Sequence, residues 1–215
     1  VMILYNPLGV KEFPDMIQLW QIWAKKNGLN GITFLHQQNN FDHTKENCGD
    51  LYSGGIEFQM NRAINEVYNN RNLGFQLERV LNRVANVLPF LRCKATTIHY
   101  DYDKIWNHII NSEPKGETWY PGAFVDFDNT PRRKNRGQVF INMTPEKYYK
   151  YLKEQIIHAR EVYKKDYLFM FAWNEWGESG YLEPDEKRGY QILEYTKKAL
   201  EETNEFPDWR KFDEN

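Results

Sequence analysis

The sequence predicts an α/β protein that forms an incomplete, C-terminal portion of a (β/α)8 barrel of the TIM type. Short apolar runs with the character of strands alternate with amphipathic helical stretches, which is typical of parallel strands joined by helices. No GxGxxG or GxxxxGK[ST] motif follows these runs, so the usual sign of an open nucleotide-binding sheet is missing. The chain has 215 residues, whereas a complete barrel needs about 250. We expect one partial barrel domain over 1–205 and a loosely ordered tail over 206–215.

The N-terminal half is predicted to begin with strand, helix and strand. We expect a buried strand at 1–5, a helix from Pro14 to Gly28, a second strand at 32–35 and a helical period at 75–88. The first helix should turn one apolar face to the core, formed by Met16, Ile17, Trp20, Trp23 and Ala24. The polar stretch 36–55 is too long for an ordinary connection and predicts a functional, lid-like loop.

The C-terminal half continues the alternation. We expect strands at 95–100, 122–127 and 167–173, the last being the strongest, with a short helix near 105–110. Thr144, Pro145 and Glu146 have the order of an N-cap and first turn, which predicts a long helix to about residue 165. A last amphipathic helix should carry Tyr190, Leu193, Tyr195 and Leu200.

Charge and hydropathy exclude several classes of protein. The chain has 28 basic and 30 acidic residues, a net charge of −2, which is not the charge of a nucleic-acid-binding protein. The longest apolar run, at 167–173, is far shorter than the roughly 18 to 20 residues of a transmembrane segment. Cys48 and Cys93 lack the spacing of a zinc site. We expect a cytoplasmic protein with reduced cysteines and no metal or other cofactor.

Aromatic residues are abundant, at 16% of the chain, and several stand among polar neighbours. Flat rings beside hydrogen-bonding groups suit the mixed apolar and hydroxylated faces of a sugar. The alternative is that most of these rings belong to the core and to buried helix faces. Both interpretations stay open at this point.

Two carboxylates follow the strongest predicted strand. Glu175 and Glu178 flank a glycine in the run FAWNEWGE at 171–178, where the carboxyl end of a barrel strand would place catalytic groups. A carboxylate beside an indole loses hydration, which favours a general acid, while its neighbour can stay ionised as a base. Cleavage and transfer of glycosidic bonds both need one carboxyl group that acts as an acid and a second that acts as a base. The alternative is an exposed loop whose acids only confer solubility.

The same segment resembles a known family. AWNEWGE at 172–178 and YLEPD at 181–185 are similar to the C-terminal signature of the glycosyltransferase WbsX family, also described as glycoside hydrolase family 99-like. DNTPRR at 128–133 and FIN at 140–142 resemble its preceding motif, and the likeness covers about 1–203. The resemblance implies a (β/α)8 barrel related to endo-acting α-mannosidases. It also implies bacterial surface polysaccharide synthesis, including O-antigen and lipopolysaccharide, with a sugar donor and a glycan acceptor as partners; a membrane-associated, lipid-linked glycan is one candidate.

The resemblance also implies roles for the two acids. Glu175 would be the base that helps the sugar's own 2-hydroxyl to attack C1, and Glu178 the acid that protonates the departing oxygen. The related hydrolases carry a histidine where this chain has Gly177, which favours the WbsX branch over a true mannosidase. The family pattern has glycine where this chain has Ser179.

Further residues are candidates for substrate binding. Two DxD patterns, at 101–103 and 126–128, match the diphosphate-binding motif of metal-dependent glycosyltransferases, but a barrel argues against that metal role. The basic segment from Arg132 to Arg136 could clamp phosphates or could be a solvated loop. The predicted substrate-binding residues are Trp173, Asn174, Trp176, Asp126, Asp128, Asn129, Arg132, His36, Gln37 and Tyr102.

The leading hypothesis is therefore a WbsX-like glycosyltransferase with Glu175 and Glu178 as catalytic residues. A retaining endo-glycosidase using the same acids is the first alternative, and a non-catalytic carbohydrate-binding barrel fragment is the second. In each case we expect the strand ends near Leu35, Phe127 and Trp173 to converge on one rim, with Glu175 in the cleft.

Overall fold

A computed structural model describes residues 1–5, 11–37, 52–69 and 97–206, together with the isolated positions 77, 80, 81 and 84. Those four positions are helical, in agreement with the helix predicted at 75–88. Most of the predicted lid-like loop, both cysteines and the tail after Phe206 lie outside the described residues.

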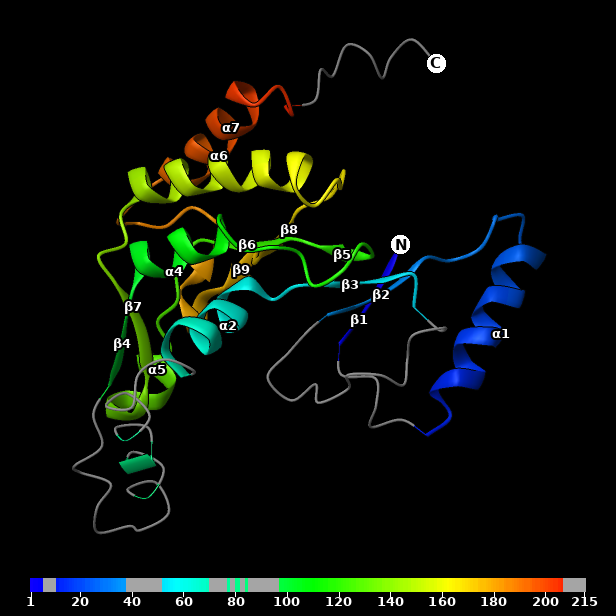
Figure 1. Cartoon of the computed structure of the whole chain (residues 1–215), viewed down its shortest axis with the longest axis horizontal. Helices are drawn as coiled ribbons and strands as arrows, with labels where there is room; N and C mark the ends of the chain where they lie inside the picture. The colour runs from blue at the N-terminus through cyan, green and yellow to red at the C-terminus, as the bar shows by residue number, and fades with distance from the viewer. Residues whose placement is uncertain are drawn as a thin grey trace.

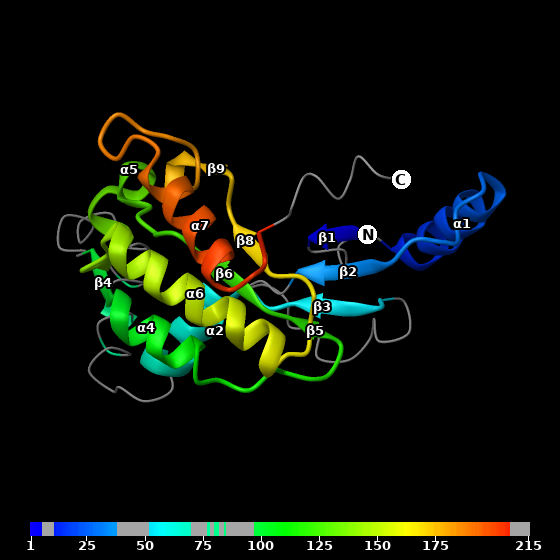
Figure 2. The same cartoon turned by 90° about the horizontal axis from the view of Figure 1, so that it is seen from above.

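Parallel strands form the centre of the fold. Four of them form one sheet in the order β1 (Met2–Tyr5), β2 (Phe34–Gln37), β3 (Gly54–Ile56) and β5 (Trp119–Tyr120). Only Pro121 separates β5 from β6 (Gly122–Phe124), and β6 pairs in parallel with β8 (Phe169–Phe171). Neighbouring strands thus follow one another in the order of the sequence (Figure 2). The protein is mixed α/β, as predicted, and the described strands do not close into a barrel.

A second parallel pair lies beside the end of β6. It consists of β4 (Ile98–Asp101) and β7 (Gln138–Ile141), at one end of the molecule (Figure 1). The Phe140 amide in β7 donates to the Phe127 carbonyl at 2.8 Å, which joins this pair to the segment after β6. The sequence predicted β4 but neither β7 nor β3.

Helices cover one side of these strands. The bounds are α2 (Gln59–Ile64) with a π-helical turn (Asn65–Asn69), α4 (Tyr102–Ile109), α6 (Pro145–Glu161) and α7 (Gln191–Glu202). Helices α6 and α7 lie side by side, whereas α1 (Phe13–Lys26) lies at the far end of the molecule (Figure 1). The side chain of Thr144 accepts a hydrogen bond from the Lys147 amide and Pro145 follows it, so the predicted start of α6 is confirmed.

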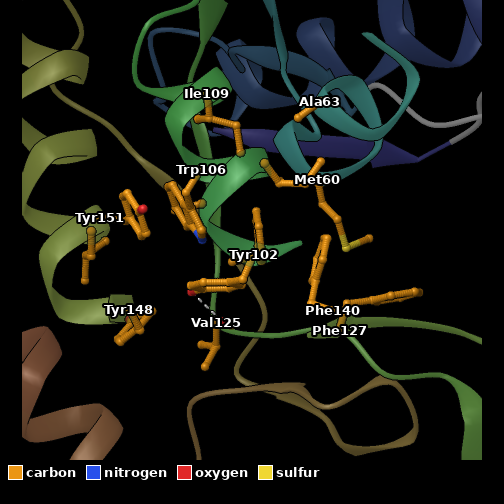
Figure 3. Packing of buried hydrophobic residues seen from close by; sticks show 14 of the residues in the cluster. Met60, Ala63, Tyr102, Trp106, Ile109, Val125, Phe127, Phe140, Tyr148 and Tyr151 are labelled. Atoms are coloured by element: carbon orange, nitrogen blue, oxygen red, sulfur yellow. Dashed lines mark hydrogen bonds between the residues drawn. The ribbon is translucent and has the colours of Figure 1, made fainter. Parts of the chain in front are cut away.

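The main core is aromatic and centres on Trp106 (Figure 3). Its indole lies between the rings of Phe124 in β6 and Tyr151 in α6, with ring centroids 4.8 Å and 5.7 Å away and interplanar angles of 21° and 2°. Tyr102 packs against the same group and donates its hydroxyl to the Val125 carbonyl at 2.8 Å. The core therefore ties α4 and α6 to β6.

A smaller core lies under α1 and corrects two expectations. Phe13, Ile17 and Phe34 are buried together, but Trp23 is 53% exposed and so does not belong to the buried face. Strand β1 was expected to be buried, yet its residues are alternately half-buried and exposed. Among the described strands β1 pairs only with β2, so it is an edge strand that exposes one side.

Two C-terminal predictions also need correction. The strand predicted as strongest at 167–173 is reduced to β8, whose three residues are only half-buried. The last helix is confirmed, but its buried residues are Ile192 and Ala199, while Tyr190 precedes it and is 65% exposed. Helix α7 packs along α6, where the ring of Tyr195 stacks on Tyr149 with centroids 5.4 Å apart.

One carboxylate is completely buried just after β3. Glu57 forms an ion pair with Arg62 and accepts hydrogen bonds from Gln59 at 2.9 Å, from the Tyr163 hydroxyl at 2.9 Å and from the Lys115 amide at 2.8 Å. A buried charge without such partners would be strongly destabilising. The network therefore fixes the start of α2 against the C-terminal end of α6.

The two tryptophans Trp106 and Trp173 provide a matched test of this packing. Replacing the fully buried Trp106 with alanine should lower the free energy of unfolding by about 3–5 kcal/mol, because it leaves a cavity. The same change at Trp173, which is 55% exposed, should cost less than about 1 kcal/mol. Urea unfolding followed by circular dichroism measures both, and equal losses would contradict this assignment of the core.

Candidate functional site

The predicted catalytic acids lie on a short hairpin that follows β8. Strand β9 (Asn174–Glu175) pairs antiparallel with β10 (Gly180–Tyr181), and a 3-10 turn (Trp176–Glu178) joins them. The Ala172 amide donates to the Gly180 carbonyl at 2.8 Å, so the base of the hairpin is attached to the end of β8. The hairpin is thus held at the carboxyl end of a parallel strand.

Two tryptophans give the hairpin an exposed aromatic surface. Trp173 is 55% exposed and Trp176 is 48% exposed. The Trp176 ring stacks on Tyr181, with centroids 4.0 Å apart and an interplanar angle of 14°, and its indole N–H donates to Glu183 at 2.6 Å. Because partners on one side hold the ring in place, its remaining surface is oriented for stacking against an apolar sugar face.

The two acids have different surroundings. Glu175 is exposed on β9. Glu178 is mostly covered, with a side chain 21% exposed, and its carboxylate forms an ion pair with the guanidinium of Arg132. Arg132 itself is 54% exposed. The structure therefore brings Glu178 and Arg132 together, whereas Glu175 faces solvent.

The segment after β6 is built to hold Arg132 beside the hairpin. The Asp128 amide donates to the Glu178 carbonyl at 2.8 Å. The Asp128 carboxylate accepts from the amide and hydroxyl of Thr130, at 2.8 Å and 2.6 Å, and the side chain of Asn129 accepts from the Gln138 amide at 2.8 Å. These bonds close a turn that contains α5 (Thr130–Arg133) and a 3-10 turn (Lys134–Arg136). Asp128 and Asn129, predicted to bind substrate, shape this turn.

Asp126 pairs with a residue that sequence reasoning missed. Its carboxylate accepts from the Phe127 amide at 2.8 Å and lies 3.4 Å from a guanidinium nitrogen of Arg188. Burial raises the pKa of Asp126, and the Phe127 hydrogen bond and the Arg188 charge offset this only in part. Arg188 gave no signal in the sequence, because its partner lies far away along the chain.

Tyr102 corrects one prediction. It was expected to bind substrate, but its side chain is completely buried in the main core and its hydroxyl is bonded to the Val125 carbonyl. The Tyr102 side chain cannot reach a ligand in this structure, because its ring packs inside the core around Trp106.

His36 and Gln37 lie at the end of β2. The His36 ring packs against Tyr52 and Trp119, with centroids 5.1 Å from each. Gln37 lines a pocket of about 220 Å³ that Ala172 also lines, so it approaches the base of the hairpin. The carboxyl ends of β2, β6 and β8 point to the same edge, since these strands are parallel.

Neither a cluster of metal ligands nor a membrane-spanning helix occurs among the described residues. The described residues contain no group of three or more His, Cys, Asp or Glu side chains placed to hold a metal ion. Within the described ranges, no helix combines the length and apolar character needed to cross a membrane.

Ser179 closes the hairpin in a left-handed conformation, with φ 57° and ψ 12°. Glycine adopts this conformation without steric cost. Ser179→Gly should change the free energy of unfolding by less than about 1 kcal/mol, and Ser179→Val should lower it by about 1–2 kcal/mol. Urea unfolding compares the variants, and a valine variant as stable as wild type would contradict the observed backbone.

Comparison with known proteins identifies relatives. Two proteins named "Uncharacterized protein WxcX", from strain B100 and a second strain of Xanthomonas campestris pv. campestris, are each 25% identical to this chain, over 202 and 204 residues. Each match covers 93% of this chain but 26% of the relative, so the chain spans about a quarter of the length of these curated relatives. No solved structure matches the chain.

The model of one protein family covers nearly the whole chain. It is described as "Glycosyltransferase WbsX" and matches residues 1–196, which include the hairpin, the turn that carries Arg132 and all the parallel strands. The chain therefore belongs to the glycosyltransferase WbsX family.

Proposed function

We propose that the protein is a carbohydrate-active enzyme of glycan assembly in which Glu175 and Glu178 are the acid–base pair. The observation that carries this proposal is the hairpin after β8, which places both carboxylates beside two exposed tryptophans. Membership of a glycosyltransferase family supports a sugar donor and a glycan acceptor as substrates.

The surroundings of the two acids fit different roles. Glu175 is exposed, so it can receive a proton from a sugar hydroxyl that approaches from solvent. Glu178 is mostly covered beside Arg132, where a departing oxygen would also find a positive charge. Trp173 and Trp176 would stack on the sugar, and Asn174, which is also exposed, would bind its hydroxyls.

The immediate neighbour of Gly177 supports a transferase over a mannosidase-like hydrolase. A Cβ atom added at Gly177 would lie 3.3 Å from Cδ of Arg132. A histidine, as in the related hydrolases, would require this arginine side chain to shift, whereas glycine leaves it in place.

We also infer that the parallel strands are consecutive strands of a (β/α)8 barrel. The order β1, β2, β3, β5, β6 and β8 in one parallel direction supports this inference, because barrel strands follow one another in this way. The proposed setting is the cytoplasmic synthesis of a bacterial surface polysaccharide such as O-antigen, with a lipid-linked glycan as a candidate acceptor.

Conservative changes of the two acids test the proposal. Glu175→Gln and Glu178→Gln should each lower turnover by about 10²- to 10⁴-fold, because the amide cannot exchange the proton, while sugar affinity stays within about tenfold. Transfer from a panel of sugar nucleotides and hydrolysis of aryl and oligomannose glycosides give the rates, and calorimetry with oligosaccharides gives the affinity.

Glu186→Gln is the matched control, since Glu186 is an exposed acid of the same polar segment. Glu183 is unsuitable as a control, because its carboxylate accepts the Trp176 indole N–H. Wild-type rates for both acid variants would refute the assignment. Sugar binding without turnover would favour a binding module, and hydrolysis without transfer would favour the glycosidase.

A further inference from the structure

The charge distribution around Glu178 points to the kind of donor that the site accepts. Residues 131–136, which include Arg132, Arg133, Lys134 and Arg136, are all exposed on the turn next to the hairpin. Figure 2 shows α5 beside β9. One of these cations, Arg132, contacts a carboxylate that the proposed function uses. A neutral glycoside gives no reason for this concentration of positive charge, whereas a phosphate group does.

Arg132 is held in place by its own segment. Asp128 and Asn129 use their side chains to close the turn, and the Arg132 amide donates to the Asn129 carbonyl at 3.1 Å. The Asp128 amide is bonded to the backbone of Glu178. The backbone that carries Arg132 is therefore fixed beside the hairpin, and the side chain reaches Glu178 from there.

The ion pair between Arg132 and Glu178 is exchangeable. With Arg132 54% exposed and Glu178 21% exposed, solvent screens the pair, and such pairs contribute little to stability. A guanidinium has five N–H donors in a planar fork that matches the oxygens of a phosphate, so a doubly charged phosphate competes well with one carboxylate.

We propose that Arg132 is the anion-binding residue of this site and exchanges Glu178 for the phosphate of a phosphate-linked sugar donor. This inference rests on the proposed function. While the pair persists, the Glu178 carboxylate is held by Arg132. Once phosphate binds the guanidinium, Glu178 is released from the pair and can take a proton from water and pass it to the departing oxygen.

In the transfer step, the leaving oxygen gains one proton and the acceptor hydroxyl loses one. The bond between the anomeric carbon and the phosphate oxygen breaks, its electron pair stays on that oxygen, and the oxygen receives the proton of Glu178. The acceptor hydroxyl forms the new bond to the anomeric carbon and gives its proton to Glu175. Arg132 stabilises the charge that develops on the phosphate.

Binding of diphosphates by the whole chain, without any turnover, tests this inference separately from the proposed function. Isothermal titration calorimetry with inorganic pyrophosphate should show affinity about 10- to 100-fold weaker for Arg132→Gln than for wild type, the loss expected for charged hydrogen bonds. Arg133→Gln removes the same charge from the same short helix and should change affinity by less than about threefold. Arg132→Lys, which keeps charge but loses the fork, should give an intermediate value.

The proposal also predicts that one variant binds pyrophosphate more tightly than the wild-type protein does. Glu178→Gln removes the competing carboxylate, so pyrophosphate should bind about three- to tenfold more tightly, which a merely structural ion pair would not produce.

Two larger diphosphates distinguish the kind of donor. Tighter binding of uridine diphosphate than of pyrophosphate supports the proposal with a nucleotide donor, and tighter binding of farnesyl diphosphate supports it with a lipid donor. Equal losses for Arg132→Gln and Arg133→Gln, or weaker binding by Glu178→Gln, overturn it and leave the acid–base assignment untouched. Circular dichroism confirms that each variant is folded.

Discussion

The parallel pairing of β6 with β8 is the constraint on which the candidate site depends. Because both strands run in the same direction, the segment that leaves β6 and the hairpin that leaves β8 emerge at the same edge. The hydrogen bond from Asp128 to Glu178 then joins these two segments directly. Arg132 and Glu178, far apart in sequence, meet as a consequence of strand direction.

The core makes this pairing rigid. Trp106 lies between Phe124 of β6 and Tyr151 of α6, so the last residue of the strand that leads to the Arg132 turn is held by stacked rings. Stacked aromatic pairs stabilise beyond the area they bury. The rings around Trp106 are buried in this core, while Trp173 and Trp176 are exposed on the hairpin.

Three ion pairs show a graded exposure that matches their roles. Glu57 and Arg62 are almost completely buried, with side chains 0% and 11% exposed, and fix α2 and α6. Asp126 and Arg188 are mostly buried and attach the segment before α7 to the end of β6. Arg132 and Glu178 are the most open of these three. Burial makes the first pair costly to break, and solvent makes the last one free to exchange.

The sequence by itself determined the features that depend on neighbouring residues. Thr144 and Pro145 predicted the start of α6, and the motif at 172–178 identified the family and the candidate acids. These signals are local, because a cap or a loop motif needs only a few consecutive residues. Their roles in catalysis stay predictions.

Tertiary structure decided the features that depend on distant partners. It placed Tyr102 in the core, paired Arg188 with Asp126, and reduced the strand predicted at 167–173 to three residues. An apolar or charged residue has the same appearance in a sequence wherever it lies. Its burial and its ion-pair partner are set by contacts between segments that the chain brings together only on folding.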